Sequence, residues 1–160
     1  MAGRRSQFRL PGLRTWVDNI KNELSREAAR QIVTDLKIIG PWYTGEFEKA
    51  WVVRLGDVRI RGEVPALPFS KRRLTTNIAP TPFVVPKPRG RKSIFYTIGN
   101  RMEYRDLAMD LVPGRVAENK RNSAPKDWYR SYIEGGNLRM TLEQSTKRVS
   151  DDPKIKGFKR

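Results

Sequence analysis

The apolar residues between positions 13 and 39 recur at steps of three and four, and polar side chains mostly fill the positions between them. This spacing is that of one face of an α-helix, and it predicts an amphipathic helix of about seven turns. The segment contains no proline, and the helix-ending pair Gly40-Pro41 follows it directly. A helix of this length must lay its apolar face on a sheet of its own chain or on a neighbouring subunit. The apolar positions are Leu13, Trp16, Val17, Ile20, Leu24, Ala28, Ile32, Leu36 and Ile39.

Later stretches carry the pattern of strands. Residues 51–61 alternate between apolar and polar positions on either side of Gly56-Asp57, a dipeptide typical of tight turns between paired strands. Residues 93–99 are rich in β-branched and aromatic side chains and end at a glycine, which predicts a buried strand. We therefore expect a β-hairpin over residues 51–61, a strand over residues 93–99, and a short edge strand at residues 83–85.

Three helix starts are predicted in the second half of the chain. Asn100 and Glu103 have the spacing of a capping box, in which two side chains satisfy the first backbone amides of a helix. Asp127 precedes the aromatic residues of a second short helix and is placed to cap it. Asn137 is placed to cap the last helix. We expect the apolar face of that helix to consist of Leu138, Leu142 and Val149.

The stretch from residue 62 to residue 92 differs in composition from the rest. Its six prolines exclude a helix or a central strand, and its seven Lys and Arg residues have no acidic residue among them beyond Glu63. We expect an extended, basic excursion that is ordered mainly by a partner. The chain is then one α+β domain over residues 1–160, with an N-terminal arm (1–12), this Pro-rich basic excursion (62–92) and a basic C-terminal tail (151–160).

The predicted fold class is therefore α+β. A long N-terminal helix packs on a small antiparallel sheet, with additional short helices and extended basic arms. The chain of 160 residues is long enough for one such domain to bury a sizeable core.

Composition removes several classes of function. The chain has no Cys and no His, which excludes a disulfide scaffold, a thiolate-bound zinc site and a Ser-His or Cys-His catalytic pair. No apolar run approaches the length that a membrane span needs. Lys and Arg number 33 against 17 Asp and Glu, a net charge of +16. Such a charge indicates an acidic partner, either nucleic acid or an acidic protein surface.

One row of carboxylates is a candidate for catalysis. Glu103, Asp106 and Asp110 are spaced to share a helical face and could hold a divalent cation, as in a nuclease. A solvated acidic face that balances the neighbouring arginines is the simpler interpretation. No phosphate-binding loop of the Gly-rich Lys-Ser/Thr type occurs, so nucleotide hydrolysis has no support.

Two classes of binding function remain open. Basic clusters lie near aromatic residues, as they do in proteins that stack nucleic-acid bases, but no signature of a known nucleic-acid-binding module is present. A structural assembly protein, with basic arms that gain order on its neighbours, also fits. At a charge of +16, non-specific contact with DNA is expected in either case.

A series of elements also resembles a protein family. The long helix is followed by Pro41-Trp-Tyr-Thr44-Gly45-Glu-Phe47, then by the strand signal of residues 52–60, the strand of residues 94–100, and a helix that carries Tyr104 and Asp110 before Gly114. This series resembles the head–tail joining and tail-completion proteins of the neck of tailed bacteriophages. The resemblance covers roughly residues 13 to 142, in order. The chain departs from the family in the residues after Tyr104 and in its long Pro-rich excursion.

The resemblance implies a structural role without catalysis, cofactor or bound metal. Proteins of this family form rings, often of six or twelve copies, at the junction between the portal or adaptor and the tail tube. It therefore implies a tail terminator, neck or tail-completion protein of the virion that is assembled in the host cytoplasm. Its partners would be copies of itself, portal or adaptor proteins and tail-tube proteins. The alternative is a basic nucleic-acid-binding protein of the ribosome-associated type.

Two sets of residues follow from this hypothesis. The candidate assembly residues are Arg4, Arg5, Arg9, Lys71, Arg72, Arg73, Arg89, Arg91, Lys92, Arg115 and Arg121. We expect them to face acidic surfaces of neighbouring subunits. The candidate structural motif consists of Pro41, Thr44, Gly45, Phe47, Trp51, Tyr104, Asp110 and Gly114.

Overall fold

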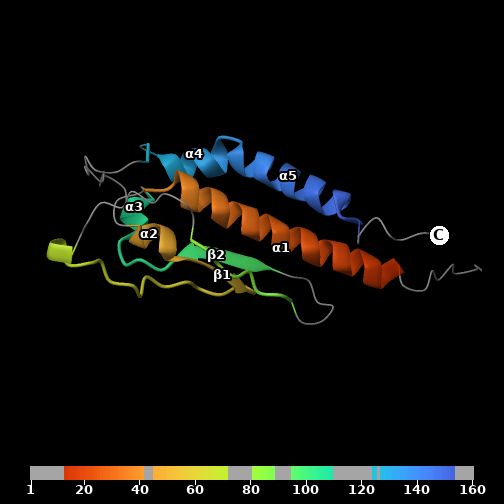
Figure 1. Cartoon of the computed structure of the whole chain (residues 1–160), viewed down its shortest axis with the longest axis horizontal. Helices are drawn as coiled ribbons and strands as arrows, with labels where there is room; N and C mark the ends of the chain where they lie inside the picture. The colour runs from red at the N-terminus through yellow and green to blue at the C-terminus, as the bar shows by residue number, and fades with distance from the viewer. Residues whose placement is uncertain are drawn as a thin grey trace, which may run out of the picture.

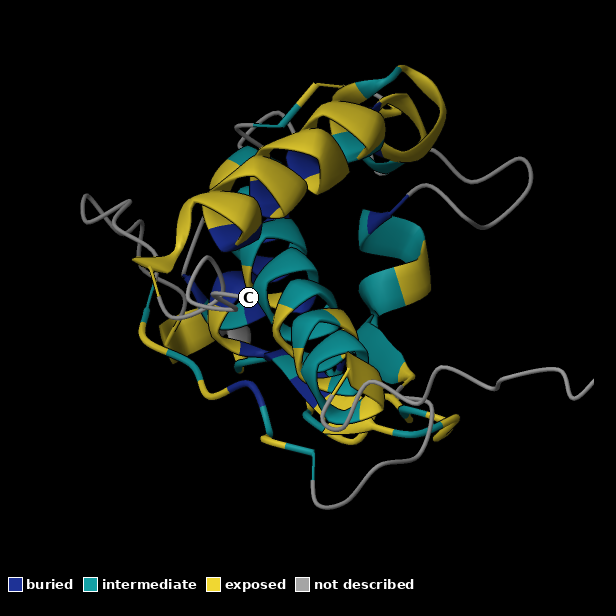
Figure 2. Cartoon of the chain, turned by 90° about the vertical axis from the view of Figure 1, so that its right-hand side faces the viewer, coloured by how far each residue is buried: buried dark blue, intermediate teal, exposed yellow. Residues whose placement is uncertain are grey.

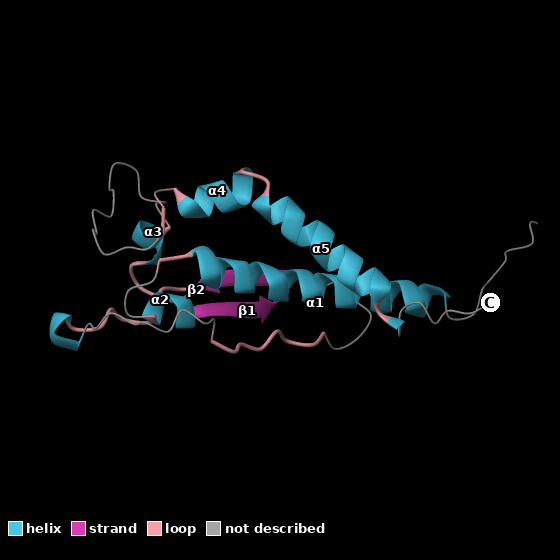
Figure 3. Cartoon of the chain, turned by 45° about the horizontal axis from the view of Figure 1, so that its top comes forward, coloured by secondary structure: helices cyan, strands magenta, loops and turns pink. Residues whose placement is uncertain are grey.

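A computed structural model describes residues 13–41, 45–71, 81–88, 95–109, 124–125 and 127–153 (Figure 1). In chain order the elements are α1 (Leu13–Ile39), α2 (Glu46–Lys49), β1 (Trp51–Leu55), the 3-10 turn η1 (Phe69–Lys71), β2 (Tyr96–Asn100), α3 (Arg105–Ala108), α4 (Trp128–Glu134) and α5 (Asn137–Asp151). Helix α1 lies between the two strands on one side and helices α4 and α5 on the other (Figure 3). This confirms the α+β class, with a long N-terminal helix on a small antiparallel sheet.

Helix α1 has the predicted bounds, but only its second half reaches the core. Its buried residues are Ala29, Val33, Leu36 and Lys37, whereas no side chain before Ala29 is fully buried. The helix ends where Gly40 donates its backbone N–H to the carbonyl of Leu36. A Cβ at Gly40 would lie 2.7 Å from that carbonyl oxygen and 3.3 Å from the Trp128 ring. Glycine at this end therefore lets α4 approach α1 closely.

The two strands pair with each other, and the predicted hairpin over residues 51–61 is wrong. Strand β1 pairs antiparallel with β2, with Trp51 opposite Asn100 and Leu55 opposite Tyr96. The chain does bend at Gly56-Asp57, but residues 58–63 form no strand. Sheet pairing is non-local, and the β-branched and aromatic segment around residues 96–100 supplies the better partner for β1.

Residues 58–64 instead cover the outer face of the sheet, opposite α1. Val52 and Gly99 are paired and share that face, because side chains alternate along a strand. A Cβ at Gly99 would lie 2.9 Å from Cδ1 and 3.2 Å from Cβ of Ile60. Ile60 therefore packs where Gly99 leaves space. Residue 64 then forms a single parallel bridge with Met102.

The core lies where α1, the sheet and α4 meet. Ala29, Val33 and Leu36 of α1 pack with a group of aromatic residues from the other elements. The Phe47 ring lies edge-on to Trp51 at 5.9 Å and edge-on to Trp128 at 6.3 Å. Such aromatic pairs contribute about 0.5–1.5 kcal/mol each beyond their buried area. The indole of Trp128 also donates to the carbonyl of Ala108, which ties α4 to α3.

The predicted capping box at Asn100 and Glu103 is wrong. Asn100 is the last residue of β2, and its buried amide donates to the carbonyl of Phe47 at 2.7 Å and accepts from the backbone of Met102 at 2.9 Å. A Glu103 carboxylate oxygen accepts from the backbone N–H of Ala66. A buried amide needs partners, and backbone groups at the end of the strand provide them. The helix that follows, α3, spans four residues.

Helices α4 and α5 form as predicted, but with different caps. Asp127 stands at the start of α4 in the left-handed conformation (φ 57°) without a capping hydrogen bond from its side chain. Gly136 is the N-cap of α5, so that Asn137 is its first helical residue. The left-handed φ of 93° at Gly136 suits glycine, which carries no Cβ.

The predicted apolar face of α5 is confirmed at Val149, which is buried, and at Leu138, which packs against the core, but is wrong at Leu142. Leu142 is 42% exposed, whereas Thr141, Ser145 and Val149 are buried against α1. Figure 2 shows exposed residues over the outer side of α5 and buried ones toward α1. Small polar residues can be buried in this contact because Ser145 donates its hydroxyl to the carbonyl of Thr141 one turn earlier, and the Thr141 hydroxyl donates to Asp35 of α1.

We expect Gly99→Ala to lower the free energy of unfolding by about 1–3 kcal/mol, because the new methyl group would displace Ile60 from the sheet. Urea unfolding measures the effect. The control is Gly99→Ala in an Ile60→Ala background. There the substitution should lower the free energy of unfolding by less, because the clashing side chain is gone. An equal cost in both backgrounds would contradict this account of the contact.

Candidate assembly interface

Most of the candidate assembly residues lie outside the described part of the chain. Lys71 is described, as the exposed last residue of η1, where its N–H bonds to the carbonyl of Pro68. The other members of that set lie outside the described residues, and so do three members of the motif. These residues are Arg4, Arg5, Arg9, Arg72, Arg73, Arg89, Arg91, Lys92, Arg115 and Arg121, and Thr44, Asp110 and Gly114 of the motif.

The five described motif residues meet at one corner of the fold. Pro41 follows the end of α1, and Gly45 has a left-handed φ of 78° as it leads into α2. The buried Phe47 ring contacts Trp51 and stacks on Tyr104 at 6.2 Å. A left-handed conformation costs a residue with a Cβ about 1–2 kcal/mol, which explains glycine at position 45. The motif therefore builds the core, and its described members are not surface contacts.

A buried ion pair lies beside this corner, between α1 and α2. Lys37 Nζ is 2.9 Å from a Glu48 carboxylate oxygen, and the side chains are 1% and 2% exposed. Thr81 completes the group: its N–H and hydroxyl donate to Glu48 at 2.7 and 2.9 Å, and its carbonyl accepts from Lys37 at 3.0 Å. We call Lys37, Glu48 and Thr81 the clamp. Full hydrogen bonding of both charges offsets the large cost of removing them from water.

The clamp holds residues 81–88 on the body. Lys37 Nζ also lies 5.1 Å from the centre of the Phe83 ring, and Val85 is buried. The hydroxyl of Tyr96 donates to the carbonyl of Pro86 at 2.9 Å. Part of the Pro-rich excursion therefore makes contacts within its own chain, which the sequence interpretation had assigned to a partner. Residues 83–85 do not form the expected edge strand.

Sequence reasoning did not find the clamp. Lys37 follows the buried Val33 by four residues, so its position on the apolar face of α1 was a usable signal. Glu48 follows Phe47 directly in a short helix and carries no comparable signal. Its partner Thr81 lies 33 residues further along the chain, and local patterns do not report such a contact.

A second polar group joins α1 to the C-terminal helices. An Asp35 carboxylate oxygen accepts from the hydroxyls of Thr141 at 2.6 Å and Tyr132 at 3.2 Å. Further along, Arg148 donates to the side-chain oxygen of Gln31 at 2.6 Å. Burial raises the pKa of Tyr132 to about 12, and the nearby Asp35 charge acts in the same direction. We call Asp35, Tyr132 and Thr141 the polar seam.

Charge is distributed unevenly along the chain. The described residues include 17 Lys and Arg and 15 Asp and Glu, a net charge of +2. The rest of the chain therefore holds 16 of the 33 cationic residues but only 2 of the 17 acidic ones, a net charge of +14. The described body is close to neutral, and the basic character of the protein belongs to the other segments.

The structure does not support a metal site at the row of carboxylates Glu103, Asp106 and Asp110. Glu103 lies before α3 and accepts from Ala66, Asp106 is exposed beside Arg105, and Asp110 lies outside the described residues. Within the described ranges, no three metal-ligating side chains come together. Among the described helices, none is long and apolar enough to cross a membrane.

Comparison with known proteins gives no match to this chain among family models, curated proteins or solved structures.

We expect Lys37→Met to lower the free energy of unfolding by about 3–5 kcal/mol, because it leaves the Glu48 charge buried without its partner. Urea unfolding gives the value. Lys49→Met is the matched control: its ion pair with Glu46 is exposed, and we expect a change within about 0.5 kcal/mol. The double variant Lys37→Met/Glu48→Gln should recover part of the loss, since it removes both charges and keeps an acceptor for Thr81. A loss in Lys37→Met no larger than in Lys49→Met would show that the clamp does not hold the fold.

The polar seam predicts a pH dependence at high pH. The folded-state pKa of Tyr132 lies above the ordinary value of 10. The contribution of this residue to the free energy of unfolding is therefore fully present below pH 10 and is lost as the pH rises toward about 12. Thermal unfolding between pH 9 and 11.5 should show a steeper loss of stability in the wild type than in Tyr132→Phe. Equal slopes for the two proteins would contradict this assignment.

Proposed function

We propose that this protein is a structural subunit of the neck of a tailed bacteriophage and forms part of an oligomeric ring that joins the head to the tail. The observation that carries the proposal is the charge distribution: the packed, described residues have a net charge of +2, and the rest of the chain has a net charge of +14. A subunit of this kind can pack its body beside other copies without strong repulsion. Its basic segments can then lie on acidic surfaces of neighbouring proteins.

The charges of the body itself are mostly balanced. Eight ion pairs occur among the described residues, and they use eight of the 17 cationic side chains there. A protein that recognises nucleic acid through its folded body presents a continuous basic face. The balance of charge therefore favours protein partners for the body.

The partners in this proposal are copies of the chain itself, in a ring of six or twelve, together with portal or adaptor proteins and tail-tube proteins. The basic segments also make non-specific contact with DNA. The role needs no catalytic residue and no cofactor. The protein then belongs to the neck or tail of the virion, after assembly in the host cytoplasm. The proposal also rests on the resemblance, of which the structure keeps the long helix, the corner at Phe47 and the later strand, but not the strand pair over residues 52–60.

A second candidate is a basic nucleic-acid-binding protein of the ribosome-associated type. The same net charge of +14 outside the described residues favours it, because clustered Lys and Arg residues also suit the phosphates of a nucleic acid. Association with nucleic acid would then be strong and would fall steeply with salt.

The test is the mass in solution of the nuclease-treated protein, measured by light scattering at low and high salt. We expect a discrete ring, or a monomer that forms one when portal or tail-tube protein is added. A monomer that does not assemble with either protein and holds RNA or DNA until salt releases it would reject the neck proposal in favour of the second candidate.

A further inference from the structure

One side of α1 faces α5, and toward the start of the helix that side becomes apolar. Asp35 and Gln31 mark the side, because they bond to Thr141 and Arg148 of α5. Four apolar residues lie at the same helical phase, and the first of them precedes Gln31 by about five full turns. The first is 38% exposed, and the other three are partly buried. We call these residues the stripe: Leu13, Val17, Ile20 and Leu24.

Helix α5 ends before it reaches most of the stripe. The two helices run antiparallel, because Thr141 bonds to Asp35 and the later residue Arg148 bonds to the earlier residue Gln31. At 1.5 Å per residue, the last described residue, Pro153, stands about level with the end of the stripe nearest the core. The stripe continues from there for about 16 Å toward the start of α1.

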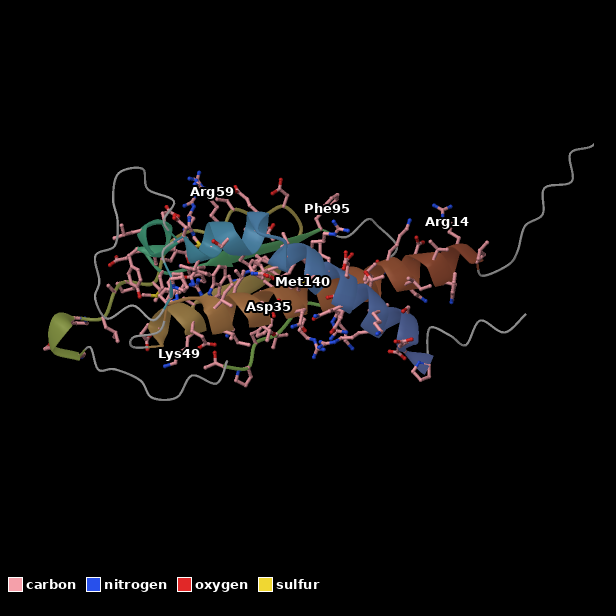
Figure 4. All side chains as sticks on the ribbon, turned by 90° about the horizontal axis from the view of Figure 1, so that it is seen from above. Arg14, Asp35, Lys49, Arg59, Phe95 and Met140 are labelled. Atoms are coloured by element: carbon pink, nitrogen blue, oxygen red, sulfur yellow. The ribbon has the colours of Figure 1, made fainter. Side chains whose placement is uncertain are left out.

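The core also ends before this part of α1. Among the described residues of α1, those in the core or packed on it begin at Ala29. Figure 1 shows the start of α1 extending beyond both strands and beyond α5. Figure 4 shows Asp35 close to α5, whereas Arg14 stands at the far end of α1, away from α5. The stripe is therefore an apolar helix face that continues past the elements that cover the rest of α1.

We propose that residues 154–160 of the same chain dock on the stripe through Ile155 and Phe158. This segment follows Pro153 directly, so it can continue along α1 without reversing its direction. Seven residues span about 10 Å as a helix and about 23 Å when extended, which is enough to cover the stripe beyond the end of α5. The two apolar residues of the segment are three positions apart, a spacing that puts both on one side of a helix. The inference is independent of the neck role.

Other occupants fit the stripe less well. Residues 1–12 join α1 at the far end of the stripe and would have to reverse direction to lie along it. Residues 89–94 lead into β2, on the opposite side of α1 from α5. A second copy of the chain would bind through about three helical turns, a small area compared with the about 800 Å² per partner of a stable interface. Residues 154–160 are already held beside the stripe by α5, so their docking avoids the entropy cost of association.

The consequence is a fixed basic surface beside the start of α1. With both apolar side chains turned toward the stripe, the cationic residues of the segment face outward at defined positions. A partner that meets charges at defined positions pays a smaller entropy cost on binding. The cationic residues are Lys154, Lys156, Lys159 and Arg160.

The test uses cysteine cross-linking in the full-length chain, which contains no cysteine of its own. The test pair is Ile20→Cys with Ile155→Cys. The matched control pair is Asn19→Cys with Ile155→Cys, because Asn19 is exposed on another side of the same helical turn. Non-reducing electrophoresis with peptide mapping measures how fast each disulfide forms. Thermal unfolding checks that each variant keeps the fold.

We expect the Ile20 pair to form a disulfide within one chain about tenfold faster than the Asn19 pair, because docking holds the two sulfurs close together. Equal rates for the two pairs would overturn the proposal. A disulfide that links two chains would also overturn it, in favour of a second copy on the stripe.

Hydrogen exchange of the α1 amides gives a second measurement that needs no cysteine. We expect the double variant Ile155→Ser/Phe158→Ser to exchange about tenfold faster than the wild type over residues 17–24, because the cover over these turns is weakened. Phe8→Ser alters the N-terminal arm and should leave the exchange rate unchanged. Faster exchange in Phe8→Ser but not in the double variant would overturn the proposal in favour of residues 1–12.

Discussion

The buried ion pair between Lys37 and Glu48 connects three parts of the chain: α1, α2 and the start of residues 81–88. It lies between α1 and α2, and both backbone groups of Thr81 bond to it. Two charges that are each almost fully removed from water are stable only with complete hydrogen bonding. The position of Thr81 is therefore specified closely. The Pro-rich stretch that follows it, residues 81–88, starts from a fixed point on the body.

The two sides of α1 are held by different kinds of interaction. Toward the sheet, α1 packs apolar and aromatic side chains, and the free energy there comes mainly from burial. Toward α5, it makes hydrogen bonds through Asp35 and Gln31, and two of the three buried residues of α5 are Thr141 and Ser145. The apolar core, which includes Trp128 of α4, is accordingly the stable part of the fold, whereas attachment of α5 depends more on correct pairing of a few polar groups.

Local signals predicted α1, α4, α5 and the two strands that form, but not the pairing of those strands, and they also predicted strands at residues 58–61 and 83–85 that do not form. The bounds of α1 follow from periodicity and from Gly40-Pro41, because both act within one or two helical turns. The partner of β1 could not be predicted from the Gly56-Asp57 bend, since strand pairing depends on contacts between distant segments. Thr141 and Ser145 were missed on the buried face of α5 because small hydroxyl residues count as polar in a sequence pattern, although here their hydroxyls bond to Asp35 and to the helix backbone. Of the clamp, only the place of Lys37 on the apolar face of α1 was visible in the sequence, because Glu48 and Thr81 meet it through contacts between distant segments.

Helix α1 is fully buried only from Ala29 onward. The sixteen residues before Ala29 span about 24 Å at 1.5 Å per residue and are at most partly buried, with Glu27 paired to Arg148 of α5. Helical phase decides which way Leu13, the first residue of the helix, faces relative to the body. An insertion of seven residues before Ala29 would move Leu13 outward by about 10 Å and nearly preserve its direction. An insertion of two residues would turn it about 200° to the opposite side. The first half of α1 can therefore change length in steps of two turns and keep the same side of the helix toward the body.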